Sequence, residues 1–414
     1  MNTPRPSTLL TLDEALARLL GAVQPLTASE TVSTFDALGR VLASEVRSLV
    51  DVPSADNSAM DGYAMRASDV PATGTLLPVS QRIPAGVVGA ALKPGTAARI
   101  FTGALLPEGA DAVVMQEQCE ALDGAVRVNT VPATGQSVRR RGEDLSHDAI
   151  ALPRGTRLTP QALGLAATAG AATLTVTRRP RVALFSTGDE LAMPGEPLKP
   201  GAIYNSNRFT LRALILSLGC ECTDLGIVPD QLDATRAALR TAAQGHDVIV
   251  TSGGVSVGEE DHLKPAVQAE GELNLWQIAI KPGKPLAFGS VRRAKGDAME
   301  EKAWFVGLPG NPVSSFITFL LAVRPLLLHL QGASVLQPVG MPMRADFDWP
   351  RADKRREFLR VRRNEQGGLD LFTNQGSGVL TSTVWADGVV DNPPETPIRA
   401  GDSVRFIALA EWVA

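Results

Sequence analysis

The fold is decided by residues 247–261, which read Asp-Val-Ile-Val-Thr-Ser-Gly-Gly-Val-Ser-Val-Gly-Glu-Glu-Asp. The run Val248-Ile-Val250 is apolar without polar alternation, which is typical of a strand that is buried on both faces. It leads directly into a loop of glycines and small hydroxyl residues. Because ligands of open α/β sheets bind beyond the carboxyl ends of the strands, this segment predicts a central strand followed by a ligand-contacting loop.

An alternating series of strands and helices continues on both sides of this segment. A helix that follows Asn205-Ser-Asn207 carries Leu211, Leu214, Ile215 and Leu218 at helical spacing. Such alternation predicts a parallel sheet with helices on both faces. The other expected strands lie at Val182–Phe185, 224–228, 274–280 and 303–307, and the other expected helices at 233–243, 263–270 and 313–330.

The flanking segments predict a multidomain chain of class α/β plus β. Thr11-Leu-Asp-Glu14 reads as a capping box that opens a helix, and a second helix followed by a strand is expected over 158–177. Residues 46–144 are dense in glycine and proline between short apolar runs, which indicates short strands and turns. The predicted parts are an N-terminal linking region over 1–45 and 145–178, a β-rich domain over 46–144, an α/β domain over 179–330 and a small all-β, barrel-like domain over 331–414.

A hairpin pattern marks the C-terminal part. Phe358–Arg363 and Leu369–Phe372 flank the turn at 364–368, and a further apolar run covers Val404–Ala408. The basic stretch Lys354–Arg363 matches no motif, and we expect it to form an exposed face of the hairpin.

Composition limits the class of protein. Of 414 residues, 44% are hydrophobic and 20% charged, which favours buried cores over disorder. The 40 Lys and Arg residues against 44 Asp and Glu give a net charge of −4, so nucleic acid is not expected as a partner. The spacing of Cys119, Cys220 and Cys222 fits neither a disulfide framework nor a zinc site, and we expect these cysteines to be small buried hydrophobic residues.

Membrane insertion is not expected either. Arg324 and Pro325 interrupt the apolar stretch at 316–330, and the first residues lack the charged and then apolar order of a signal peptide. These features favour a cytoplasmic protein.

Polar loops follow the expected strands, and each offers groups that suit an oxyanion. If the sheet forms as predicted, the loops converge on one edge. They are Ser186-Thr-Gly-Asp-Glu190, Pro229-Asp230, Thr251–Asp261, Lys281-Pro-Gly-Lys-Pro285 and Gly307-Leu-Pro-Gly-Asn-Pro312.

The expected donors are of three kinds. Small residues let the backbone approach a ligand, lysines add positive charge, and the turn Pro309–Pro312 opens a helix whose first N–H groups favour an anion. Candidate contacts to substrate from the glycine loop and the lysines are Ser252, Gly253, Gly254, Ser256, Lys281 and Lys284.

Acidic residues complete the candidate site. Asp189, Glu190, Asp230 and Asp261 are hard oxygen ligands that suit magnesium bound between carboxylates and substrate phosphates. The combination predicts an ion-assisted reaction at a phosphoanhydride. A single Ser-Gly-Gly turn is usually structural, Asp189 can cap a segment and Lys284 can be merely solvated, so the prediction depends on the joint pattern. Neither a G-x-x-x-x-G-K-[ST] nor a G-x-G-x-x-G motif occurs, which disfavours P-loop hydrolysis and a standard dinucleotide site.

Polar islands also occur in the N-terminal half, and by themselves they fit turns as well as sites. With the loops above they form an ordered set of motifs: Asp56-Asn-Ser-Ala-Met-Asp-Gly-Tyr-Ala64, Thr102-Gly103, Leu106–Val114, Gly142-Glu-Asp144, Ser186–Leu191, Ile203–Asn207, Ser252–Gly258, Lys281–Pro285 and Gly307–Ser314. This set resembles the bacterial molybdopterin molybdenumtransferases, the MoeA family, which is similar to the E-domain of gephyrin.

The resemblance implies an elongated homodimer with an α/β domain like that of the molybdopterin adenylyltransferases, and an adenylyltransferase as a partner protein. The implied reaction inserts molybdate into adenylylated molybdopterin, cleaves the adenylate and releases AMP with magnesium. By the same resemblance, the catalytic set is Asp61, Asp144, Glu190, Asp230 and Asp261. Glu190, Asp230 and Asp261 would hold the metal ion. Lys281 and Lys284 would receive anionic groups, and Pro309, Pro312 and Ser314 would line the anion pocket.

The resemblance also implies that Asp61, Thr102 and Asp144 reach the site from the other chain of the dimer. The motifs do not separate molybdate from tungstate. An adenylyltransferase would not need the N-terminal acidic islands, and a purely scaffolding protein would not need polar loops aimed at one cleft. An added binding role stays open.

Overall fold

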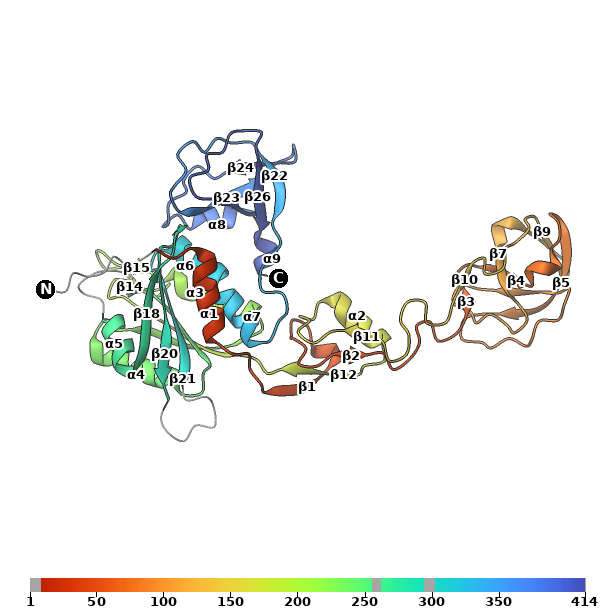
Figure 1. Cartoon of the computed structure of the whole chain (residues 1–414), viewed down its shortest axis with the longest axis horizontal. Coiled ribbons are helices and arrows are strands. Elements are labelled where there is room, and N and C mark those ends of the chain that lie inside the picture. Colours follow the sequence, from red (N-terminus) through yellow and green to blue (C-terminus); the bar gives the residue numbers. More distant parts are fainter. Residues whose placement is uncertain (1–8, 255–261, 294–301, 414) are drawn as a thin grey trace.

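The computed structural model describes residues 9–254, 262–293 and 302–413. The chain is elongated: an α/β domain with the C-terminal β domain beside it lies at one end, and an arm leads to a separate β module at the other (Figure 1). We call this separate part the distal module (residues 52–145).

A mixed sheet of six strands forms the centre of the α/β domain. β13 (Arg181–Thr187) pairs in parallel with β16 (Glu221–Val228) and β17 (Val248–Ser252), and β17 pairs in parallel with β21 (Lys302–Leu308). β20 (Pro285–Arg292), which the sequence did not predict, is antiparallel to both β21 and β18 (Gly271–Gln277). β18 therefore runs in the same direction as the parallel strands, and its turn to β20 lies at their carboxyl edge.

Helices cover both faces of this sheet, as predicted. One core contains α1 (Leu12–Ala22), α3 (Ser206–Ser217), α6 (Pro312–Thr318) and α7 (Arg324–Leu330), with a π-helical turn over Phe319–Val323 between the last two. The other core contains α4 (Leu232–Ala243) and α5 (Leu263–Glu270). In the described part, the stretch Pro312–Leu330 is the one helix long and apolar enough to cross a membrane by length and composition, and most of it is buried inside the domain.

The predicted capping box opens α1. The backbone N–H of Glu14 donates to Thr11 Oγ1 at 3.2 Å, and the N–H of Thr11 donates to Glu14 Oε2 at 2.8 Å. Leu12 and Leu19 are buried in the α/β core, so the N-terminal helix belongs to the packing of that domain.

The arm and the distal module are built from short strands, as the glycine and proline pattern indicates. In the arm, β1 (Ser29–Ser33) pairs with β12 (Thr173–Thr177), β2 (Val46–Arg47) pairs with β11 (Ile150–Leu152), and α2 spans Pro160–Thr168. The distal sheet has the order β7-β4-β6-β5-β9-β8. Its strands are β4 (Gly62–Met65), β5 (Thr75–Ile83), β6 (Ala97–Ile100), β7 (Ala112–Met115), β8 (Cys119–Leu122) and β9 (Ala125–Val128), beside the pair β3 (Asn57–Ser58) and β10 (Val138–Arg139).

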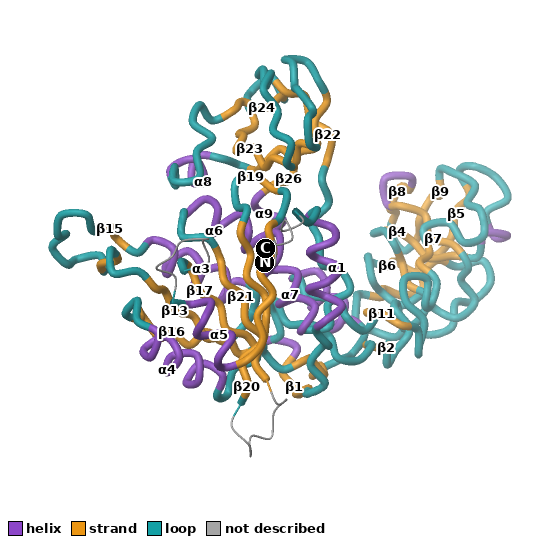
Figure 2. The backbone as a smooth tube through the Cα atoms, turned by 60° about the vertical axis from the view of Figure 1, so that its left-hand side comes forward, coloured by secondary structure: helices purple, strands orange, loops and turns teal. Residues whose placement is uncertain are grey.

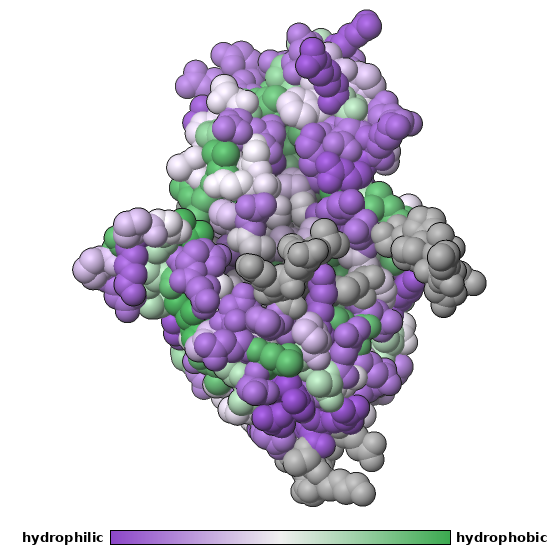
Figure 3. All heavy atoms as spheres, turned by 90° about the vertical axis from the view of Figure 1, so that its left-hand side faces the viewer, coloured by the Kyte–Doolittle hydropathy of each residue, from purple (hydrophilic) through white to green (hydrophobic). Residues whose placement is uncertain are grey.

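The C-terminal domain is a barrel-like sheet in the order β19-β23-β24-β22-β26-β25, closed by a further pairing of β23 with β25. Two short helices accompany it, so it is not purely β. The face of this domain that Figure 3 shows is mainly hydrophilic. The elements are β19 (Ile280–Lys281), β22 (Met341–Ala345), β23 (Arg356–Arg363), β24 (Gly368–Leu371), β25 (Gly388–Asn392), β26 (Ser403–Ala408), α8 (Thr381–Trp385) and α9 (Leu409–Val413).

The expectation of an exposed basic hairpin face at Lys354–Arg363 is wrong for the middle of the stretch, because Glu357–Val361 are buried, whereas Lys354, Arg362 and Arg363 are exposed. β23 pairs with β19, β24 and β25, so it is an interior strand. Arg360 is 1% exposed and donates to Ser382 Oγ and to the Gly376 carbonyl. Burial lowers the pKa of this guanidinium to about 10.

Candidate functional site

The polar loops at the carboxyl edge of the α/β sheet lie against one another, and we call this edge the rim (residues 186–190, 229–230, 252–254, 281–285 and 307–312). The backbone N–H of Gly253 donates to the carbonyl of Leu308 at 3.1 Å. The hydroxyls of Ser186 and Ser252 lie 3.3 Å apart. The side-chain amide of Asn207 donates to the carbonyl of Gly310 at 2.7 Å. The structure thus brings the described rim loops together.

Glycine is required where two rim loops approach most closely. Gly253 has φ +92°, and an added Cβ would lie 2.7 Å from the carbonyl oxygen of Thr187. Gly254, with φ +66°, also needs a left-handed conformation. Ser252 before them is buried. This bare backbone would let the loop approach a ligand, and the ligand contact itself stays a prediction.

The turn between β18 and β20 is seated on helix α6. Gly283 has φ +102°, and an added Cβ would lie 2.4 Å from Thr318 Oγ1 and 3.3 Å from the Ser314 carbonyl oxygen. The close contact seats the turn against α6, and the side chain of Lys284, the next residue, is exposed. In the described residues, the buried hydroxyls of Ser315 and Thr318 have no hydrogen-bond partner.

We expect Gly283→Ala to lower the free energy of unfolding by about 2 kcal/mol. The alanine would be strained by the left-handed φ, and its methyl group would also collide with α6. Urea denaturation measures this loss. Gly245→Ala is the matched control: Gly245 has φ +76° and open space around its Cβ position. It should lose about 1 kcal/mol from backbone strain alone. Equal losses in the two variants would show that the contact with α6 is not tight.

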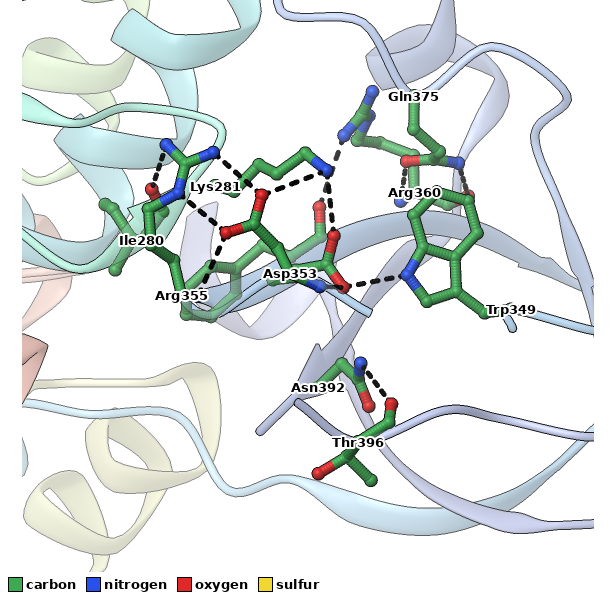
Figure 4. A network of polar contacts seen from close by, with 11 residues as sticks. Ile280, Lys281, Trp349, Asp353, Arg355, Arg360, Gln375, Asn392 and Thr396 are labelled. Carbon is green, nitrogen blue, oxygen red and sulfur yellow. Dashed lines mark hydrogen bonds and ion pairs between the residues drawn. The ribbon is translucent and has the colours of Figure 1, made fainter. Parts of the chain in front are cut away.

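Lys281, predicted as an anion receptor, is held by the C-terminal domain (Figure 4). Its Nζ lies 3.1 Å from Glu357 Oε1 and 3.5 Å from Asp353 Oδ2. Asp353 also binds the guanidinium of Arg355, and these hydrogen bonds lower the pKa of the carboxyl group well below its usual value. Lys281 is thus a cation with a fixed partner, whereas Lys284 makes no ion pair with another described residue.

The start of α6 is also in contact with the C-terminal domain. Pro312 has no N–H, and the N–H of Val313 donates to the carbonyl of Ser377 at 2.9 Å. The expectation that the first N–H groups of this helix face an anion is therefore wrong for Val313. Ser314 and Pro309 are buried and Pro312 is half-buried beside the glycine loop. The view in Figure 2 shows the C-terminal domain above the edge of the sheet where α6 begins.

The carboxylates of the rim supply oxygen donors, the kind of ligand that magnesium prefers. Asp189 Oδ1 accepts a hydrogen bond from the N–H of Asp230 at 3.3 Å, and the carboxyl group of exposed Glu190 lies beside Gly188. Among the described residues, no three His, Cys, Asp or Glu side chains form a group that could hold a metal ion. The third predicted ligand, Asp261, lies outside the described residues, as does Ser256. The metal site therefore stays a prediction.

The other predicted set lies in the distal module. Asp61 Oδ1 accepts hydrogen bonds from both the N–H and the hydroxyl of Thr102, at 2.8 Å each. These two bonds, with a smaller contribution from Arg99, lower the pKa of Asp61. Asp144 is exposed on the segment that pairs with residue 52. Within one chain this set is remote from the rim (Figure 1).

The whole length of the chain matches known proteins. The MoeA N-terminal region (domain I and II) matches residues 10–170, a domain described as "Probable molybdopterin binding domain" matches 183–329, and the MoeA C-terminal region (domain IV) matches 342–409. Molybdopterin molybdenumtransferase of Haemophilus influenzae is 41% identical over 96% of this chain and 98% of its own. The chain belongs to the molybdopterin molybdenumtransferase family.

Further members support the same assignment. Molybdopterin molybdenumtransferase of Nostoc sp. is 35% identical over 98% of this chain and 94% of its own. The crystal structure of a molybdopterin biosynthesis moeA protein from Pyrococcus horikoshii OT3 matches with a TM-score of 0.80 at 29% identity, over 97% of this chain and 100% of that one. The predicted resemblance and the predicted fold class are confirmed.

In this member of the molybdopterin molybdenumtransferase family, sequence reasoning missed the contribution of the C-terminal domain to the rim. Glu357 and Asp353 contact Lys281, and Ser377 contacts the start of α6. The signal for Glu357 was a single carboxylate among the basic and apolar residues of Lys354–Arg363, since a fully buried charge requires a partner.

A pH titration tests the role of Thr102 beside Asp61. Thr102→Val removes the hydroxyl donor and keeps the backbone donor, so the pKa of Asp61 should rise toward its usual value. An Asp61 carboxylate that persists to low pH in the wild type should then be protonated at higher pH. ¹³C NMR of the aspartate carboxyl groups measures the shift. An unchanged titration would mean that the backbone N–H alone sets the pKa of Asp61.

Proposed function

We propose that this transferase inserts molybdenum from molybdate into adenylylated molybdopterin, with cleavage of the adenylate and release of AMP. Its family places it among the transferases of molybdenum cofactor biosynthesis. The observation that supports the finer proposal is the assembly of the rim. There, the glycine loop contacts the loop Gly307–Pro312, and the turn that carries Lys281 and Lys284 packs on α6.

The proposed reaction needs such a rim because both substrates are anions. Molybdate is a tetrahedral dianion and the adenylate contains a phosphoanhydride, so the site must neutralise several negative charges at once. Exposed Lys284 would supply one cation, and Lys281, held by Glu357, would supply a second. Ser252, Gly253 and Gly254 would offer hydroxyl and N–H donors to substrate oxygens.

We also propose a homodimer in which the distal module of one chain completes the rim of the other. Asp61 and Thr102 form a pre-organised pair in the distal module, and this pair has no access to the rim of its own chain. A two-fold symmetric dimer would make two equivalent composite sites. We place this dimer in the cytoplasm, where a molybdopterin adenylyltransferase would supply the adenylate.

Magnesium is the proposed metal ion. Glu190 and Asp230, with Asp261, would hold it through oxygen ligands, and it would supply positive charge at the phosphate oxygens of the substrate. The side chains of this chain would meanwhile orient the two anions and exclude water between them.

The deciding experiment measures AMP release by the purified chain from adenylylated molybdopterin. We expect AMP only when molybdate and magnesium are both present, and none with EDTA or in Asp261→Ala. If the adenylate binds but no oxyanion or metal ion triggers AMP release, the proposed reaction is wrong. The chain would then act as a cofactor carrier or scaffold.

A further inference from the structure

Among the contacts of the C-terminal domain with the rim is a fully buried carboxylate. Glu357 is 0% exposed, and Lys281 Nζ donates to its Oε1 at 3.1 Å. The backbones are fixed as well, because β19 pairs with β23 with Lys281 opposite Glu357. The side chain of Lys281 is 37% exposed, so it reaches solvent while its ammonium group contacts Glu357 and Asp353 (Figure 4).

The other contacts of Glu357 leave it little freedom. Its Oε2 accepts from Trp349 Nε1 at 2.8 Å and from the N–H of Asp353 at 3.1 Å. A fully buried carboxylate is tolerated only where hydrogen bonds and an opposite charge compensate it, and Lys281 supplies the opposite charge for Glu357. Asp353, by contrast, is bound mainly by Arg355, at 3.0 and 2.9 Å. Glu357 therefore determines where the ammonium group of Lys281 lies.

We propose that Glu357 is a positioning residue for oxyanion binding, which holds the ammonium group of Lys281 at the rim. This inference rests on the proposed function and extends it to a residue outside the rim. A free lysine side chain loses rotamer entropy when it binds an anion, and a partner that has already ordered it reduces that loss. Without the charge of Glu357, Lys281 samples other rotamers and oxyanion affinity falls.

Calorimetric titration of the purified full-length chain with sodium molybdate tests the inference. We expect Glu357→Gln to weaken binding about tenfold, and Lys281→Met to weaken it at least as much. The double variant should bind no more weakly than Lys281→Met, because both changes remove the same positioned cation. In the AMP-release assay of Glu357→Gln, KM for molybdate should rise by the same factor as the dissociation constant, while kcat stays within about twofold of the wild-type value.

Asp391→Asn is the matched control. Asp391 is 4% exposed on β25 and binds Arg356, the neighbour of Glu357 on β23, at 2.6 and 2.7 Å. Asp391→Asn removes a buried carboxylate of the same sheet that pairs, among the described residues, with Arg356 and Arg405 rather than with Lys281. Molybdate binding should therefore stay at the wild-type level. Equal weakening in this control would show that Glu357 acts only through the stability of the domain.

Other outcomes would overturn the inference. Unchanged molybdate binding in Glu357→Gln would show that Glu357 does not position Lys281. Tighter binding would mean that Glu357 competes with the oxyanion for Lys281. Additive losses of affinity in the double variant would mean that the two residues act separately. Should Glu357→Gln not fold, unchanged binding in Lys281→Met rejects the inference by itself. A wild-type chain that binds no molybdate contradicts the proposed function instead.

Discussion

A heterodimer of one Asp61→Ala chain and one Glu190→Ala chain is expected to release AMP at about half of the wild-type rate, although each variant alone is nearly inactive. In the proposed dimer, each site combines the rim of one chain with the distal module of the other. The rim of the Asp61→Ala chain then meets the intact distal module of the Glu190→Ala chain, which restores one site of two. The second site carries both changes and stays inactive.

Two different affinity tags and co-expression allow the heterodimer to be purified away from both homodimers before its rate is measured. The matched control pairs Asp61→Ala with Thr102→Ala. Both changes lie in the distal module, so each composite site has one defect and no activity should return. Activity in the control, or its absence in the first heterodimer, would show that the sites are not shared between chains in this way.

The alternating α/β series was predictable because its strands are uninterrupted apolar runs and its helices have regular spacing. The helix expected at 263–270 spans Leu263–Glu270 in the structure. β20 was missed because Pro285 and Gly289 interrupt its pattern, and both residues are uncommon in strand interiors. Gly289 is needed there because an added Cβ would lie 2.0 Å from the Glu272 carbonyl oxygen of β18. Contact between strands, rather than local propensity, selects that glycine.

The rim was predictable as a set of loops because each loop carries its polar residues together. The partner of Lys281 was not, since Glu357 lies 76 positions later in another domain. The basic stretch around Arg360 was misread for a related reason: the partners of Arg360 include Ser382 on α8 and Gly376 in the loop before that helix. Residue spacing contains no information on such pairings.

Asp247→Ala is expected to lower the free energy of unfolding by about 3 kcal/mol. Asp247 is 7% exposed at the start of β17, and its two carboxylate oxygens accept from both terminal nitrogens of Arg178 at 2.7 Å. It also accepts from the N–H of Arg181 at 2.8 Å, so it ties the end of the arm to the first strands of the sheet. The lower end of the range for a broken buried pair applies because 22% of the Arg178 side chain reaches solvent.

Urea denaturation followed by tryptophan fluorescence measures this loss, and hydrogen exchange of β13 and β17 locates it. Replacing both partners, as Arg178→Met with Asp247→Leu, should cost less than Asp247→Ala, because no unpaired charge is left at the junction. Glu120→Ala is the surface control: its pair with Arg127 has both side chains more than 40% exposed and should contribute under about 1 kcal/mol. If Asp247→Ala costs no more than Glu120→Ala, the junction is held by the strand pairings alone and the ion pair contributes little to its stability.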